Sequence, residues 1–412
     1  MSLSPDLFRN NRLKFFDRIP ENSAVVLFAG SSRKMSQDSE YRFLPDRNFY
    51  YLTGISTENA RLIMVRNGDI RDCFLFMPPK DETAERWHGK RMTFAEASRL
   101  SGIEEKDILP IGDFEDKLYF VSRDLLLDLC YDGTSISDEN ASFVKSHDGI
   151  KDISSVLTSL RMVKSEEEIE AIRKAAKLTE DALSDMKEML VAGSCENDCY
   201  AALEYGMAKR GSLIPAFSTI TAIDGNAFYL HHSDPEGPEG PVFREGSFIQ
   251  IDVGGRYDGY CADISRVYFI GRGDPQTEKR REALLGLSRK LRAEAFAYIK
   301  PGITFKGLNE HMKDLLGKWL VENELCAADA DMAEETKKYY WHNTGHHLGL
   351  DVHDISDREA PFEAGNCLAI EPGVYIPQWD IGFRIEDDVL VTGSGCELLS
   401  SGIDTPESVY IG

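Results

Sequence analysis

The chain has 412 residues, which at about 150 residues per domain allows two or three domains with hydrophobic cores. Its 47 Lys and Arg residues against 70 Asp and Glu residues give a formal net charge of −23, which argues against nucleic acid or an anionic membrane as a partner. A hydrophobic content of 42% excludes a disordered acidic chain. Since there is no apolar run of membrane-spanning length, no visible secretory signal and no close cysteine pairing, a cytoplasmic protein with free thiols is expected.

Residues 1–160 are predicted to form a smaller α/β domain. Thr93 and Glu96 have the spacing of a capping box, which predicts a short helix that ends near Gly102. The aromatic segment 48–54 is interpreted as part of the core rather than as a cofactor site. Short β-rich runs are typical of strands and occur at residues 23–29, 61–65 and 73–77.

Residues 161–412 repeat one pattern, in which two helices are followed by a pair of strands. The first copy opens with a capping box at Ser165 and Glu168, and its elements are predicted at residues 165–190, 194–210 and 247–270. The elements of the second copy are predicted at residues 277–299, 304–325 and 367–391. This repetition predicts a pseudo-symmetric α+β domain in which the two strand pairs face each other.

The first strand pair carries two acidic residues, Asp252 and Asp263, within apolar sequence. A turn centred on Tyr257 and Asp258 would place the two carboxylates opposite each other, with Cβ atoms about 4.5–5.5 Å apart. A turn on Asp258 and Gly259 would shift this register, so the pairing is a hypothesis. Two buried carboxylates at that distance repel each other unless a cation lies between them.

The second strand pair repeats the arrangement with Glu371 and Glu386. These glutamates share one face if the turn is centred near Gln378 and Trp379. Arg384 has the same parity as Glu386, so it could orient a carboxylate without binding metal itself. Any one of these acids is more easily explained as a surface ion pair, but four in matched positions favour a metal centre.

A histidine-rich segment follows the second pair of predicted helices, where residues 341–354 contain four of the nine histidines of the chain. Imidazole binds metals and transfers protons near neutral pH. The H-E-x-x-H pattern of zincins is absent here. Four carboxylates balance two divalent ions, and mostly oxygen ligands favour Mn²⁺, with Co²⁺, Fe²⁺ and Zn²⁺ as alternatives. Two ions about 3.5–4 Å apart would lower the pKa of a bridging water, which is hydrolytic chemistry.

These segments together resemble the pita-bread metallopeptidases, and most closely the aminopeptidase P family of Xaa-Pro aminopeptidases. The resemblance is carried by residues 251–255, 262–266, 346–354, 370–373 and 384–388, and extends to residues 40–43, 49–54 and 160–165. It implies a C-terminal pita-bread catalytic domain over residues 161–412, preceded by the family's N-terminal domain over residues 1–160.

The resemblance also implies the identity of the metal ligands. His346 is taken as the histidine ligand instead of its neighbour His347, because the family motif places the ligand seven residues before His353. In the family pattern Asp263 and Glu386 bridge both ions. The full implied ligand set is Asp252, Asp263, His346, Glu371 and Glu386.

Further residues acquire implied roles toward substrate. His353 is expected to stabilise the tetrahedral intermediate, and Glu371 is a candidate proton shuttle. His231 is expected to contact substrate, although adjacent His232 leaves that assignment open. The other implied roles belong to His342 in a proline pocket, Arg384 beside the ligands, and Trp87, which in tetrameric relatives reaches a neighbouring active site.

The implied activity is release of the first residue from peptides with an N-terminal Xaa-Pro sequence, by attack of a metal-bridging hydroxide on the carbonyl that precedes proline. A homodimer or a homotetramer is expected from the family. Prolidase, which cleaves only Xaa-Pro dipeptides, shares the metal site and stays an alternative, as does a non-catalytic peptide-binding protein on the same fold. The acidic, proline-rich loop 234–241 is expected to connect strands rather than to line an entrance.

Overall fold

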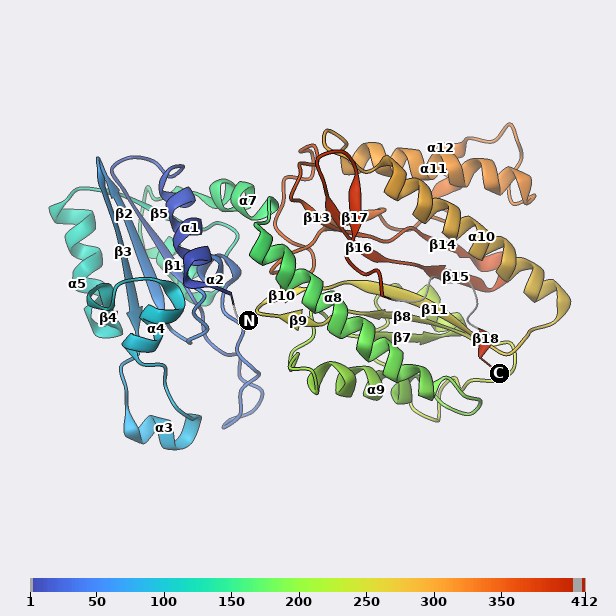
Figure 1. Ribbon diagram of the computed structural model, residues 1–412, viewed down its shortest axis with the longest axis horizontal. Coiled ribbons are helices and arrows are strands. Elements are labelled where there is room, and N and C mark those ends of the chain that lie inside the picture. The colour runs from blue at the N-terminus through green and yellow to red at the C-terminus, as the bar shows by residue number, and fades with distance from the viewer. Residues whose placement is uncertain (1–2, 403–409, 412) are drawn as a thin grey trace. The chain divides into compact units, whose positions relative to one another are not determined.

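The computed structural model describes residues 3–402 and 410–411 and divides the chain into two units, Met1–Arg161 and Met162–Gly412 (Figure 1). Among the described residues, none of the helices combines the length and apolar character that crossing a bilayer requires.

The first unit is built on a mixed sheet with the strand order β4-β3-β2-β1-β5-β6. Its strands are β1 (Ser23–Phe28), β2 (Arg61–Asn67), β3 (Ile70–Met77), β4 (Ile108–Pro110), β5 (Asp128–Tyr131) and β6 (Lys151–Asp152). The helices are α1 (Pro5–Phe16), α2 (Arg47–Thr53), α3 (Glu82–His88), α4 (Phe94–Ser101), α5 (Phe114–Tyr119), α6 (Asp138–Ser146) and α7 (Ser154–Met162). All six residues of β1 are buried, as expected for a strand covered on both faces.

The predicted local signals of the first unit are confirmed. Helix α4 begins at the Thr93–Glu96 capping box and ends at Gly102, whose φ of 67° is the left-handed conformation of a helix C-terminus. The aromatic segment forms α2, and its Phe49 and Tyr51 side chains are buried in the core.

The second unit contains two four-stranded sheets, with the orders β18-β11-β8-β7 and β12-β13-β16-β17, and two short hairpins. Its strands are β7 (Ile220–Ile223), β8 (Phe248–Val253), β9 (Arg256–Tyr257), β10 (Tyr260–Cys261), β11 (Ile264–Ile270), β12 (Gly345–His347), β13 (Cys367–Ile370), β14 (Gly373–Ile376), β15 (Ile381–Arg384), β16 (Asp387–Val391), β17 (Cys396–Leu398) and β18 (Tyr410–Ile411). The helices are α8 (Glu166–Met186), α9 (Glu196–Ala208), α10 (Pro275–Tyr298), α11 (Phe305–Glu322) and α12 (Met332–Lys337). The predicted repetition of two helices and a strand pair is therefore present.

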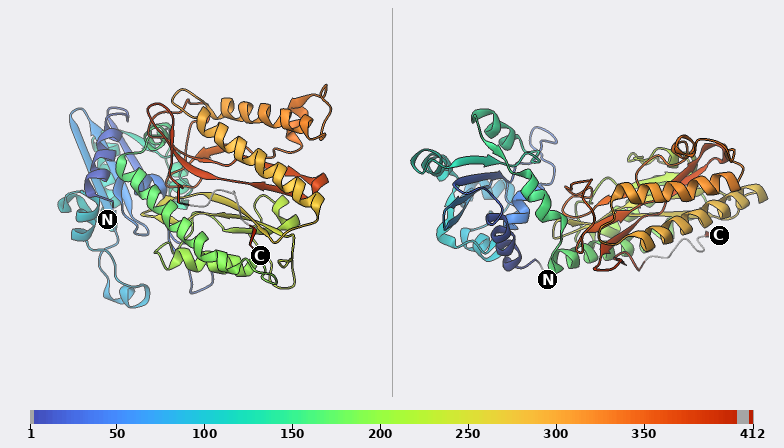
Figure 2. Two further views of the ribbon diagram at one scale, coloured as in Figure 1. Left: turned by 45° about the vertical axis from the view of Figure 1, so that its right-hand side comes forward. Right: turned by 90° about the horizontal axis from the view of Figure 1, so that it is seen from above.

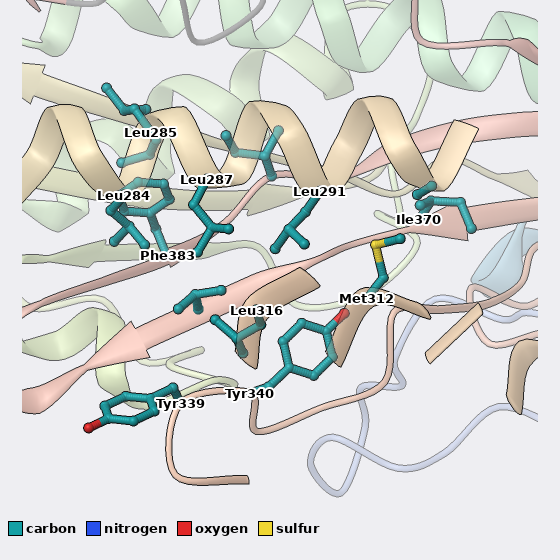
Figure 3. Close-up of a cluster of buried hydrophobic side chains, with 14 of the residues drawn as sticks. Leu284, Leu285, Leu287, Leu291, Met312, Leu316, Tyr339, Tyr340, Ile370 and Phe383 are labelled. Carbon is teal, nitrogen blue, oxygen red and sulfur yellow. The ribbon is translucent and has the colours of Figure 1, made fainter. Parts of the chain in front are cut away.

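Two hydrophobic clusters hold the second unit together. One joins α8 and α9 to β8 and β11. The other joins α10 and α11 to strands of both sheets, and Figure 3 shows Leu284, Leu291, Met312, Ile370 and Phe383 meeting in it. Figure 1 shows α8 with α9 and α10 with α11 on opposite sides of this unit, with the labelled strands between the two helix pairs in that view, and Figure 2 gives two further views. This packing fixes the strand pairs from which the site is built.

Candidate active site

The first strand pair has a different register from the one predicted. Asp252 pairs with Ser265, and Tyr257 pairs with Tyr260, so the turn lies on Asp258 and Gly259. The predicted pairing of Asp252 with Asp263 is wrong because an Asp-Gly pair readily adopts the two positive φ angles of a tight hairpin turn, here 47° and 86°. The shift is two residues, and side chains alternate with a period of two, so both carboxylates stay on one face.

The second strand pair has the predicted register. Ile370 pairs with Asp387 and Gly373 pairs with Arg384, and the same register brings Glu371 opposite Glu386. The turn is the short 3₁₀ segment Pro377–Trp379. Each hairpin therefore supplies two carboxylates to one cavity of the second unit.

The carboxylates of the two hairpins meet His346, which lies on β12. Its Nε2 atom lies 3.4 Å from a carboxylate oxygen of Asp263, and 4.0 Å from oxygens of both Glu371 and Glu386. One ligand atom each of Asp263, His346 and Glu386 lie within 4.8 Å of one another. Asp252 is also buried, and it lines one cavity together with these residues.

The donor set fits divalent cations. Asp252 Oδ2 accepts hydrogen bonds from Arg384 Nη2 at 2.5 Å and from Nε at 3.2 Å. Within the described part of the chain, its other oxygen, Oδ1, is buried without a hydrogen-bond partner. Burial, and then the charge of neighbouring carboxylates, raises the pKa of Asp263 and of Glu386 well above the ordinary range. The guanidinium of Arg384 offsets the negative charge of the four carboxylates only in part, and bound cations would supply the remaining positive charge.

Glu371 has the pKa of a group that exchanges protons near neutrality. Burial and then Asp252 raise the pKa of its carboxyl to about 7, against the opposing effects of His346 and Arg384. Its side chain is 17% exposed, and its Oε2 lies 3.4 Å from His342 Nδ1. Glu371 is thus the acidic side chain in the cluster with access to the cavity and a pKa suited to proton transfer.

His342 lines the same cavity and packs against aromatic side chains behind it. Burial lowers the pKa of its imidazole to about 4, so the ring is neutral at physiological pH. Its Nε2 lies 3.1 Å from the hydroxyl of Tyr375, and Trp341 stacks on the Tyr375 ring at 4.8 Å between centroids. Tyr375 Oη in turn lies 3.5 Å from Arg384 Nη1.

His353 stacks on the His346 ring at 3.8 Å between centroids. Burial and then the charge of His346 lower the pKa of His353 to about 4. His231 is exposed and lines the cavity, and the carbonyl of its neighbour Leu230 accepts a hydrogen bond from Arg384 Nη2 at 3.1 Å. These side chains surround one cavity of about 990 Å³ that lies entirely within the second unit.

Comparison with known proteins assigns the chain to a family. Residues 170–393, more than half of the chain, match metallopeptidase family M24. The chain belongs to metallopeptidase family M24. Residues 8–126 match the aminopeptidase P N-terminal domain. The predicted family resemblance, and the predicted fold of a pita-bread domain that follows an aminopeptidase P N-terminal domain, are confirmed.

Individual relatives of this M24 chain match over nearly their whole length. The Xaa-Pro aminopeptidase of Escherichia coli K12 is 27% identical over 439 residues, covering 99% of this chain and 97% of the relative. The structure of Pseudomonas aeruginosa aminopeptidase PepP has a TM-score of 0.87 and 28% identity, covering 99% of this chain and 97% of that chain. E. coli aminopeptidase P with the inhibitor Pro-Leu has a TM-score of 0.88 and 25% identity, covering 99% and 98%.

Adjacent histidines of this M24 site take different directions. His346 lies beside the carboxylates, whereas His347 is 1% exposed and makes edge contacts with Phe305 and Phe362. Burial lowers the pKa of His347 to about 3, which keeps the ring neutral in this apolar setting. Sequence reasoning left His347 without a role, and the structure places it in the core.

Trp87 and Tyr375 lie outside the carboxylate cluster of this M24 chain. Trp87 lies on α3 of the first unit and is 83% exposed. Tyr375 was not predicted as a site residue, although it follows Glu371 and Gly373 at strand spacing and so shares their face. That alternation was the signal that could have identified it.

Proposed function

We propose that this M24 chain is a metal-dependent Xaa-Pro aminopeptidase that releases the first residue from peptides with proline in the second position. The observation that carries the proposal is the cluster of carboxylates beside His346, in which Asp252 Oδ1 is buried without a hydrogen-bond partner, next to a cavity large enough for a short peptide. The names of the relatives, which are Xaa-Pro aminopeptidases over matching lengths, support the substrate class.

Five residues would hold two divalent ions: Asp252, Asp263, His346, Glu371 and Glu386. Because four of the five offer carboxylate oxygens, Mn²⁺ suits the site better than a thiol-preferring ion, and Co²⁺, Fe²⁺ and Zn²⁺ stay as alternatives. When bound, such ions lower the pKa of a shared water and polarise the carbonyl of the scissile bond. Arg384 holds Asp252 in place through both of its hydrogen bonds.

Glu371 carries the proton. The scissile bond is a tertiary amide, so the leaving proline nitrogen has no N–H and needs a delivered proton. Glu371, which lines the cavity, would accept a proton from the attacking water and return it to that nitrogen. The net negative charge of the cluster also favours a free α-amino group on the substrate.

The histidines bind and orient the peptide. A neutral His353 donates a hydrogen bond to the carbonyl oxygen as negative charge develops on it. His231, which is exposed and lines the same cavity, contacts the substrate. His342 lines the cavity and contacts the proline ring, and the buried Tyr375, which packs edge-on against the His342 ring and stacks on Trp341, holds it in place.

The proposal extends to the first unit and to assembly. Residues 1–160 would form the aminopeptidase P N-terminal domain, and residues 161–412 the catalytic domain. The exposed Trp87 suits a surface that another copy covers, in a homodimer or homotetramer. A cytoplasmic location, with no nucleic-acid or membrane partner, stays a prediction from composition.

The test is a matched set of peptides, offered to protein that has been stripped of metal and resupplied with Mn²⁺. Release of the first residue from Xaa-Pro-Yaa-Yaa, with no cleavage of Xaa-Ala-Yaa-Yaa, is the expected result. Cleavage of the Xaa-Pro dipeptide alone would make the protein a prolidase. If no peptide is cleaved although two metal ions bind, the proposal is wrong, and the chain is instead a non-catalytic peptide-binding protein on the same fold.

A further inference from the structure

A buried carboxylate lies outside the metal cluster, at the start of α9. Glu196 is completely buried, and each of its oxygens accepts two hydrogen bonds. Oε1 accepts from the amide of Ile223 at 2.7 Å and from Asn226 Nδ2 at 2.9 Å. Oε2 accepts from His232 Nε2 and from the amide of Glu236, both at 2.8 Å.

These four bonds exclude a metal-binding explanation for the group formed by Glu196, His232 and Glu236. A carboxylate offers about four lone-pair positions, and all of those on Glu196 are used by N–H donors. His232 Nε2 must carry a hydrogen to donate to Glu196, so its lone pair is not free for an ion. Glu196 therefore accepts hydrogen bonds from four groups that all belong to residues 223–236.

The stretch that Glu196 holds is residues 223–236, which carries one wall of the cavity. Leu230, His231 and Ser233 line that cavity, and the Leu230 carbonyl is bonded to Arg384. The two bonded ends of the stretch lie on Glu196, at Ile223 and at Glu236. His232 points to Glu196, whereas the preceding side chain, His231, lies on the cavity side.

We propose that Glu196 is a positioning residue, which fixes residues 223–236 so that His231 faces the substrate while His232 is engaged behind it. The part that concerns substrate rests on the proposed function, because that function makes His231 a substrate contact. The claim that Glu196 fixes residues 223–236 depends only on the four hydrogen bonds described above.

Hydrogen–deuterium exchange of the full chain tests the fixing of the segment without reference to activity. A glutamine at position 196 has one acceptor oxygen, and its amide group would face two N–H donors, so Glu196→Gln loses about half of the bonds. Peptides covering residues 224–236 should exchange faster in Glu196→Gln, while peptides covering β11 should not change. Glu239→Gln, the same change at an exposed site nearby, is the matched control.

Kinetics on an Xaa-Pro-Yaa-Yaa peptide test the link to His231. Since small misplacements of a positioned group lower rates by up to about 100-fold, Glu196→Gln should lower kcat/KM about tenfold, mainly through KM, with metal content unchanged. In the His231→Ala background, Glu196→Gln should not lower kcat/KM any further, because Glu196 affects the substrate only by positioning His231. An equal loss in both backgrounds would overturn the positioning role.

Substitution of His232 keeps the proposal testable if Glu196→Gln fails to fold. His232→Gln retains a donor near the position of Nε2 and should stay close to wild-type exchange and KM. His232→Leu should show the same faster exchange and the same higher KM as Glu196→Gln. Unchanged exchange in residues 224–236 for both Glu196→Gln and His232→Leu would overturn the proposal, whether or not any peptide is cleaved. Failure of the proposed function would instead appear as inactivity of the wild type, with the exchange result intact.

Discussion

Lys164 and Asp354 form an ion pair inside the second unit, with Lys164 Nζ 3.0 Å from an Asp354 carboxylate oxygen and both side chains 1% exposed. The two residues are 190 positions apart in sequence. The backbone amide of Asp354 also donates to the carbonyl of His347 at 2.9 Å. Because His353 immediately precedes Asp354, this pair anchors the segment that carries a proposed catalytic histidine.

Lys164→Met should destabilise the second unit strongly, because it leaves the Asp354 carboxylate buried without its cation. Removal of one partner of a buried pair costs about 3–5 kcal/mol. The double variant Lys164→Met/Asp354→Leu should recover much of that loss, since an apolar pair replaces the ionic one. Differential scanning calorimetry of the full chain measures both. Equal stability of Lys164→Met and wild type would show that the pair does not hold the segment.

Asp263→Asn should abolish hydrolysis and metal binding together. Loss of a residue that only orients a ligand already lowers metal affinity about 10–100-fold, so loss of a central ligand should exceed that. Metal content by mass spectrometry and hydrolysis of an Xaa-Pro peptide are measured on the same sample. Asp380→Asn, the same change at an exposed turn residue, is the control. Full activity of Asp263→Asn would remove Asp263 from the ligand set.

His353→Ala should lower kcat by about 100–1,000-fold, the usual cost of removing one donor to a developing oxyanion, with both metal ions still bound. Its stacking on the His346 ring puts it next to a ligand without making it one. His147→Ala, in the first unit, is the control for loss of an imidazole elsewhere. If His353→Ala loses metal instead, the residue has been misassigned and is itself a ligand.

Local signals in the sequence predicted much of this architecture, and long-range contacts account for what they missed. The Ser165–Glu168 capping box, the Gly102 helix end and the second hairpin register all depend on residues close in sequence, and they were predicted correctly. The first hairpin register was wrong because the Asp258–Gly259 turn was given too little weight. The acids nevertheless kept their shared face, since that depends only on parity.

The directions of paired histidines could not be predicted from their immediate neighbours. His232 turns away from the cavity because of Glu196, which lies 36 residues earlier in the chain. His347 is buried because Phe305 and Phe362 pack around it, and both come from other elements. Tertiary contacts determine which of two adjacent histidines faces the cavity. The sequence around the pair does not contain that information.

The metal-free protein should lose stability as the pH rises through about 7. Burial and then Asp252 raise the pKa of Glu371 from 4.5 to about 7. A carboxyl group whose pKa is higher in the folded chain contributes stability that is full below its unfolded pKa and is lost as the pH rises through the folded value. His342 and His353 act in the opposite sense, because burial lowers their pKa values from 6.5 to about 4, but their effect is complete above about pH 6.5.

Thermal unfolding of chelator-treated protein between about pH 6.5 and 8.5 therefore isolates the carboxyl groups. The melting temperature should fall across this range, and the gain on adding Mn²⁺ should grow, because metal binding displaces the protons that the cluster holds at lower pH. Glu371→Gln has no carboxyl to titrate, so its metal-free melting temperature should fall less steeply. The same slope in wild type and Glu371→Gln would show that Glu371 does not set the pH dependence, and would assign it to Asp263 and Glu386 or to the overall charge of −23.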